Sequence, residues 1–139
     1  MYMAWTIPNK EFNSERIENP SAEHIREWMG KLDDGWWSSF YIIDQKKNTL
    51  TVINASEDRV MVNFWGYGSK PGGLMDPAYL ESDERIEVIG EPDGSPYMFY
   101  ETVQNDVAIN VLAYFAKNGK LPGDYSWGGY GKSLDEFIG

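Results

Sequence analysis

Residues 102–127, TVQNDVAINVLAYFAKNGKLPGDYSW, form the stretch around which the fold is organised. Apolar residues recur through its first half at the spacing of one helical face. Thr102 or Asn105 can supply the side-chain oxygen that caps the start of such a helix. Gly119 follows the last turn and tolerates the left-handed backbone with which helices commonly end. The stretch therefore predicts a helix over 103–117 that is apolar enough to cover a sheet.

The residues before this helix predict the sheet that it would cover. Alternating or β-branched runs bounded by turn residues are typical of antiparallel strands. Such runs occupy 1–7, 37–44, 49–54, 59–65, 85–89 and 97–100, and 124–127 can add an edge strand. A second helix is predicted over 20–33, whereas 66–80 holds four glycines and two prolines and predicts a loop. We therefore predict one α+β domain over 1–139, with a mostly antiparallel sheet of about five or six strands and two helices packed on one face.

Composition limits the classes of function. The chain has 139 residues, no cysteine, and no apolar run near the roughly 20 residues that span a bilayer. Disulfides and thiolate chemistry are therefore excluded, and the first ten residues, MYMAWTIPNK, lack the pattern of a signal peptide. We expect a cytoplasmic protein that does not bind membranes.

Negative charge is concentrated in one segment. The formal net charge is −10, and residues 76–101 contribute −7 of it, with eight acidic side chains against the single Arg85. Such a surface repels nucleic acid and attracts a basic partner at an enhanced rate. We therefore expect no binding to nucleic acid.

The sequence offers little for catalysis. Its one histidine, His24, falls in the first turn of the first predicted helix, where a surface or capping role is commoner than a catalytic one. Phosphate-binding loops, nucleophile elbows and dinucleotide fingerprints are absent from the sequence. Glu81, Asp83 and Glu84 can serve acid–base chemistry or bind Ca²⁺, but a solvated acidic face is the commoner use of such a cluster. We predict no enzyme, no cofactor and no metal.

Large aromatic residues near the acidic segment indicate a protein-binding surface. Tyr67 and Tyr79 fall in the predicted loop, where rings are hard to bury, and Trp65 can belong to either core or surface. The predicted partner-binding residues are Trp65, Tyr67, Asp76, Tyr79, Glu81, Asp83, Glu84, Glu87, Glu91 and Asp93.

The C-terminal part of the chain resembles a known family. The helix over 103–117 ends near an aromatic residue, the turn Asn118-Gly119-Lys120-Leu121-Pro122 follows it, and Trp127 comes a few residues later. This order is similar to that of the first numbered family of immunity proteins from bacterial polymorphic toxin systems, often encoded beside deaminase-type toxins. The resemblance implies an α+β domain that binds a cognate toxin inside the producing cell and occludes its basic active site. It transfers no catalytic residue.

Two other functions remain open at this point. A ligand-binding or enzymatic domain would use a pocket between sheet and helices, lined by aromatic residues such as Trp36, Trp37 and Tyr114. An adaptor would bury its acidic face against a larger basic assembly. For the toxin-binding function, which the sequence favours, we expect a monomer or weak dimer.

Overall fold

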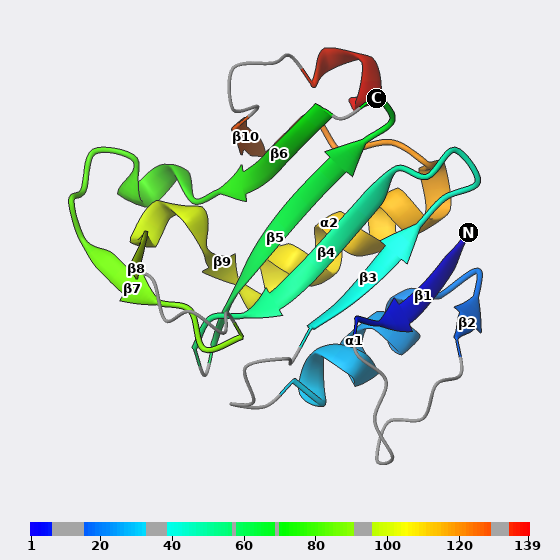
Figure 1. Cartoon of the computed structure of the whole chain (residues 1–139), viewed down its shortest axis with the longest axis horizontal. Helices are drawn as coiled ribbons and strands as arrows, with labels where there is room; N and C mark the ends of the chain where they lie inside the picture. Colours follow the sequence, from blue (N-terminus) through cyan, green and yellow to red (C-terminus); the bar gives the residue numbers. More distant parts are fainter. Residues whose placement is uncertain (7–15, 33–38, 57, 69, 91–95, 129–133) are drawn as a thin grey trace.

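Figure 1 shows the computed structural model, which describes residues 1–6, 16–32, 39–56, 58–68, 70–90, 96–128 and 134–139. Within these ranges eight strands form one antiparallel sheet in the order β10-β6-β5-β4-β3-β1-β2, and β9 pairs with β5 beside this path. Its strands are β1 (Tyr2–Trp5), β2 (Ile17–Glu18), β3 (Ser39–Ile43), β4 (Thr49–Asn54), β5 (Arg59–Gly66), β6 (Lys70–Met75), β9 (Val103–Gln104) and β10 (Ser126–Gly128). A separate antiparallel pair is formed by β7 (Arg85–Glu87) and β8 (Pro96–Met98).

Two helices, α1 (Ala22–Gly30) and α2 (Asn105–Asn118), cover one face of the sheet (Figure 1). Alternate residues of the central strands, among them Phe40 and Val62, are fully buried in the same core cluster as Leu112 of α2. Burying a side chain of this size contributes about 1.5 to 3 kcal/mol. The predicted α+β fold, with a mostly antiparallel sheet and two helices on one face, is therefore confirmed.

A capping box begins α1. The Ser21 hydroxyl accepts a hydrogen bond from the His24 backbone N–H at 3.2 Å, and the Ser21 N–H donates to His24 Nδ1 at 3.1 Å. The capping role expected for His24 is confirmed. On the buried face of the helix, the Trp28 ring stacks on Trp5 with 4.6 Å between centroids. These two features fix the position of α1 on the sheet.

Ser21→Ala is expected to lower the free energy of unfolding by about 1 kcal/mol, because the His24 N–H then loses its acceptor. Ser21→Gly keeps an unhindered backbone at the cap and is expected to cost only a few tenths of a kcal/mol. Urea denaturation of the two variants measures the difference. Both variants lack the hydroxyl acceptor, so the expected difference reflects the easier access of water to the freed N–H beside glycine; equal losses would show that this access does not matter here.

The second helix begins later than its sequence predicts. Val103 pairs with Val60 in the sheet, so the predicted first turn is strand β9 instead. The N-cap is Gln104, which makes no side-chain cap, and neither predicted capping residue, Thr102 or Asn105, fills that position. The C-terminal prediction is confirmed, since Gly119 has the left-handed φ of 68° and its N–H donates to Phe115 O. Strand pairing thus displaced the start of the helix and left its end unchanged.

The segment over 66–80 is not the loop that its glycines and prolines predicted. Within it, β6 pairs with β5 on one side and with β10 on the other. Gly72 faces the C-terminal segment so closely that a Cβ there would lie 2.4 Å from Leu134 Cδ1 and 3.0 Å from Gly128 O. Gly72 therefore allows the C-terminal segment to pack closely on β6, and it does not mark a turn of the chain. With β6 and β9 included, the sheet has more strands than the predicted five or six.

The C-terminal residues close the sheet edge beside β6. The edge strand expected near Trp127 is present as β10, and Leu134 is buried in the main core, with Phe137 and Ile138 packed against it. The remaining elements are the 3₁₀ helices η1 (Pro77–Tyr79), η2 (Phe99–Glu101) and η3 (Asp135–Phe137). No helix in the described part of the chain is both long and apolar enough to cross a membrane.

Candidate partner-binding surface

Four carboxylates stand exposed on the segment that runs from η1 through β7, at one end of the sheet (Figure 1, left). We call them the acidic surface: Glu81, Asp83, Glu84 and Glu87. Among the described residues none of the four has an ion-pair partner. Arg85 is also exposed and shares its side of β7 with Glu87, so it is the countercharge within this surface. The four predicted contacts are thus brought together and left open to solvent.

The acidic surface stands on an anchored backbone. A second apolar cluster of Ala55, Met61 and Val88 joins the end of β7 to the outer face of the sheet. The Gly90 N–H donates to Asn54 O at 2.7 Å, and the Ile89 N–H donates to Ala55 O at 3.3 Å. Burial and hydrogen bonds therefore hold the backbone directly after Glu87 against the sheet.

Asp76, a predicted contact residue, is instead the partner of a buried arginine. Arg59 is only 6% exposed, and its Nη2 donates to Asp76 Oδ2 at 2.7 Å. The same guanidinium donates from Nε to Thr102 Oγ1 at 2.8 Å and from Nη2 to Thr102 O at 2.6 Å. The other Asp76 oxygen accepts from the Ala78 N–H at 3.1 Å and so caps η1. Asp76 therefore links the buried Arg59 to η1, the 3₁₀ helix that precedes the acidic surface.

Tyr79 is also held inward, contrary to the exposure expected of a ring in a loop. Its ring packs edge-on against Phe99, with 4.5 Å between centroids, and it is half-buried. The Arg59 guanidinium carbon lies 4.1 Å from the Phe99 centroid and 5.5 Å from the Tyr79 centroid. Nothing in the sequence distinguishes Arg59 from an exposed cation, so this cluster was missed.

Trp65 and Tyr67 are exposed but lie away from the acidic surface. Their side chains are 54% and 73% exposed, which places Trp65 outside the core. Both stand near the β5–β6 turn, and the six residues of β6 separate that turn from Asp76 by roughly 17 Å of strand. Trp65 lines a groove of about 330 Å³ on the outer face of the sheet with Asn63 and Pro71. The structure thus separates the two rings from the carboxylates they were predicted to flank. The remaining predicted contacts, Glu91 and Asp93, lie outside the described residues.

A second aromatic pair stands on the outer face near β1. The Tyr2 and Tyr41 rings meet edge-on with centroids 6.2 Å apart, and Arg16 lies 4.3 Å above the Tyr2 ring. Burial raises the pKa of Tyr41 above its ordinary value, and its hydrogen bond with Tyr2 raises that pKa further. The Tyr41 phenol is therefore neutral at pH 7 and adds no negative charge to this face.

The described residues hold no group of three or more His, Asp or Glu side chains placed to bind a metal ion. The centre of the space between sheet and helices, where a ligand-binding function was expected to have its pocket, is filled by buried side chains such as Phe64 and Phe115. A pocket of about 300 Å³ lies at the edge of this space, beside β6, β10 and the start of α2. Of the rings proposed to line that pocket, Tyr114 donates its hydroxyl to Gly139 O, and Trp36 and Trp37 lie outside the described residues. Among the predicted acidic contacts that the structure describes, those of the acidic surface are the ones that lie together and exposed.

The turn that carries the family resemblance has a structural role. After Gly119 ends α2, Leu121 bridges in parallel to Ile138, and the Trp127 indole donates to Pro122 O at 3.1 Å. These contacts return the chain from α2 to the edge of the sheet. No known family model matches the chain, and no curated protein matches it closely enough to count as a relative.

Proposed function

We propose that this protein is an immunity protein that acts inside the cell, binding a cognate toxin through the acidic surface and occluding the toxin's active site without turnover. The observation that carries the proposal is the set of four exposed carboxylates without ion-pair partners among the described residues. A toxin that attacks nucleic acid, such as a deaminase, needs cations where the substrate phosphates lie. A fixed anionic surface is complementary to such a site.

The internal cluster behind this surface supports the same function. The ion pair between Arg59 and Asp76 and the apolar cluster under β7 hold the surface in place before any partner arrives. A preorganised interface loses less side-chain and loop entropy on binding, so more of its electrostatic attraction appears as affinity. We expect the inhibitor to act as a monomer or weak dimer and to bind one toxin domain.

The test reverses three charges together, as Glu81→Lys, Asp83→Lys and Glu84→Lys. The association rate with the toxin domain is expected to fall at least about tenfold at low salt, and its salt dependence is expected to flatten, because long-range attraction steers the encounter. The toxin domain is taken from the neighbouring reading frame, or is captured from the native cell with the wild-type protein as bait. Surface plasmon resonance at several salt concentrations gives the rates.

A matched triple variant, Glu23→Lys, Glu27→Lys and Asp124→Lys, changes the net charge equally on exposed residues outside the acidic surface. It is expected to keep most of the association rate and to protect cells that express the toxin. If the acidic-surface variant protected those cells as well as the wild type, and associated as fast as the control, the proposed interface would be wrong.

A further inference from the structure

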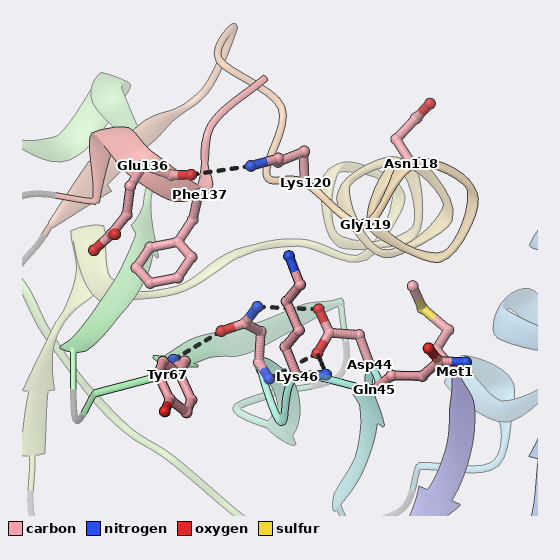
Figure 2. A pocket seen from close by; sticks show the side chains of 11 residues that line it. Met1, Asp44, Gln45, Lys46, Tyr67, Asn118, Gly119, Lys120, Glu136 and Phe137 are labelled. Carbon is pink, nitrogen blue, oxygen red and sulfur yellow. Dashed lines mark hydrogen bonds between the residues drawn. The ribbon is translucent and has the colours of Figure 1, made fainter.

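An open cleft of about 770 Å³ is shown in Figure 2. It adjoins the β3–β4 turn, which lies at the end of the sheet opposite β7 and the acidic surface (Figure 1). Its walls come from the β3–β4 turn, from Tyr67 after β5, from the end of α2, and from η3. A cleft of this volume falls in the range that encloses small organic ligands. Neither the fold nor the proposed toxin binding requires this hollow.

The carboxylates that line the cleft already have partners. Asp44 accepts from the Lys46 N–H at 2.8 Å, from the Asn48 N–H at 2.9 Å and from Asn48 Nδ2 at 3.0 Å, and so closes the β3–β4 turn. Glu136 is ion-paired with Lys70. Both acids are therefore engaged in holding the walls, and neither forms an ion pair with Lys46 or Lys120, although Asp44 keeps its negative charge.

Two lysines, Lys46 and Lys120, line this cleft. Figure 2 shows the Lys46 side chain rising from the β3–β4 turn into the cleft, toward the ammonium of Lys120. Lys120 Nζ donates to the backbone oxygen of Glu136 at 3.1 Å, which uses one of its three N–H groups. Among the described residues, neither ammonium is ion-paired with a carboxylate. Two like charges that face one cavity are stabilised by an anion between them.

The surroundings keep the cleft positive in an otherwise acidic protein. Lys47 in the same turn adds a cation nearby. The negative end of the α2 dipole also faces this region, and the Lys120 ammonium offsets it. Around the cleft the ammonium groups of Lys46, Lys47 and Lys120 outnumber the carboxylates of Asp44 and Glu136, whereas the acidic surface holds four carboxylates and one arginine.

Aromatic side chains complete the lining. Tyr67 is 73% exposed as a residue, and its backbone N–H donates to Asn48 Oδ1 at 2.7 Å. Phe137 lies on the same side of the cleft, and its ring contacts Phe64 in the core with 5.0 Å between centroids. An exposed ring held by its own backbone is a ready stacking surface for a flat heterocycle, and such stacking contributes about 1 to 3 kcal/mol per base.

We propose that this cleft binds a small anion that carries a flat ring, of the nucleoside monophosphate class. The phosphate lies between Lys46 and Lys120, and the base stacks on Tyr67. A single nucleotide enters this local positive region, whereas a nucleic acid polymer also meets the net charge of −10. The proposal does not rest on toxin binding, because none of its three contacts belongs to the acidic surface.

Calorimetric titration with adenosine 5′-monophosphate tests this site, with adenosine and inorganic phosphate as part-ligands. We expect the monophosphate to bind and each part-ligand to bind at least about tenfold more weakly, because each lacks one of the two kinds of contact. Lys46→Gln and Lys120→Gln are each expected to weaken binding of the monophosphate about tenfold. Tyr67→Ala is expected to weaken the monophosphate and leave inorganic phosphate unchanged.

Lys117→Gln is the matched control, since it removes the same charge from an exposed neighbour that does not line the cleft. It is expected to keep affinity within about twofold of the wild type. Three results would overturn the proposal: no heat of binding at millimolar monophosphate, equal losses in Lys117→Gln and Lys46→Gln, or equal affinities for the monophosphate and inorganic phosphate. None of these results bears on the acidic surface, so the two proposals fail separately.

Discussion

Arg59→Leu is expected to lower the free energy of unfolding by about 3 to 5 kcal/mol, the usual cost of removing one partner from a buried ion pair. The leucine leaves the Asp76 carboxylate without its cation, although that side chain is only 18% exposed. It also removes two hydrogen bonds to Thr102 and the cation that lies over the Phe99 ring. Urea denaturation followed by tryptophan fluorescence measures the loss.

An exposed ion pair supplies the matched control. Arg16 Nε lies 2.7 Å from Glu18 Oε1, the same distance as in the buried pair, but both side chains are more than half exposed. Arg16→Leu is therefore expected to cost less than about 1 kcal/mol, because water screens the pair. Comparable losses in the two variants would mean that burial of Arg59 does not control its contribution.

The Arg59 prediction also links stability to the proposed interface. Asp76 caps η1, and η1 leads directly into the acidic surface, so Arg59→Leu loosens the segment that carries the four carboxylates. We expect faster amide exchange over 76–87 even where the core stays folded. Exchange that rose equally over the whole sheet would indicate global destabilisation without this local effect.

Gly72→Val is expected to destabilise the protein by about 3 kcal/mol, although valine favours strands and glycine does not. The added Cβ would meet Leu134 Cδ1 at 2.4 Å and the backbone oxygen of Gly128 at 3.0 Å. Leu134 is buried and can yield little, and Gly128 belongs to the paired edge strand β10. Either the C-terminal segment or β10 must move, which urea denaturation measures directly.

Gly30→Ala provides the opposite case. Gly30 is the last residue of α1, and a Cβ there meets no atom within 4 Å. The alanine is expected to raise the free energy of unfolding by about 0.5 kcal/mol, because it restricts the unfolded chain and favours the helix. A Gly72→Val variant as stable as the wild type would show that the close approach does not constrain this position.

Local sequence patterns determined most of the main-chain elements. Apolar alternation predicted the strands from Ser39 to Trp65, and helical spacing with a terminal glycine predicted α2 and its end at Gly119. These features depend on a side chain and its near neighbours in the sequence, so they can be predicted without knowing the fold. The run of acids that forms the acidic surface was visible for the same reason.

The tertiary structure decided what the same residues do once distant segments meet. The glycines within 66–80 predicted a loop, but this segment forms strand β6. At Gly72 the space of a side chain is occupied by Leu134 and Gly128. Asp76, which the sequence predicted as a surface contact, is instead the ion-pair partner of Arg59. Strand β6 lies between Tyr67 and Asp76 in the chain and so places the exposed Tyr67 at the other end of the sheet. Pattern and charge fix the elements and their exposed faces, whereas packing between segments far apart in the chain fixes which charges stay free to bind.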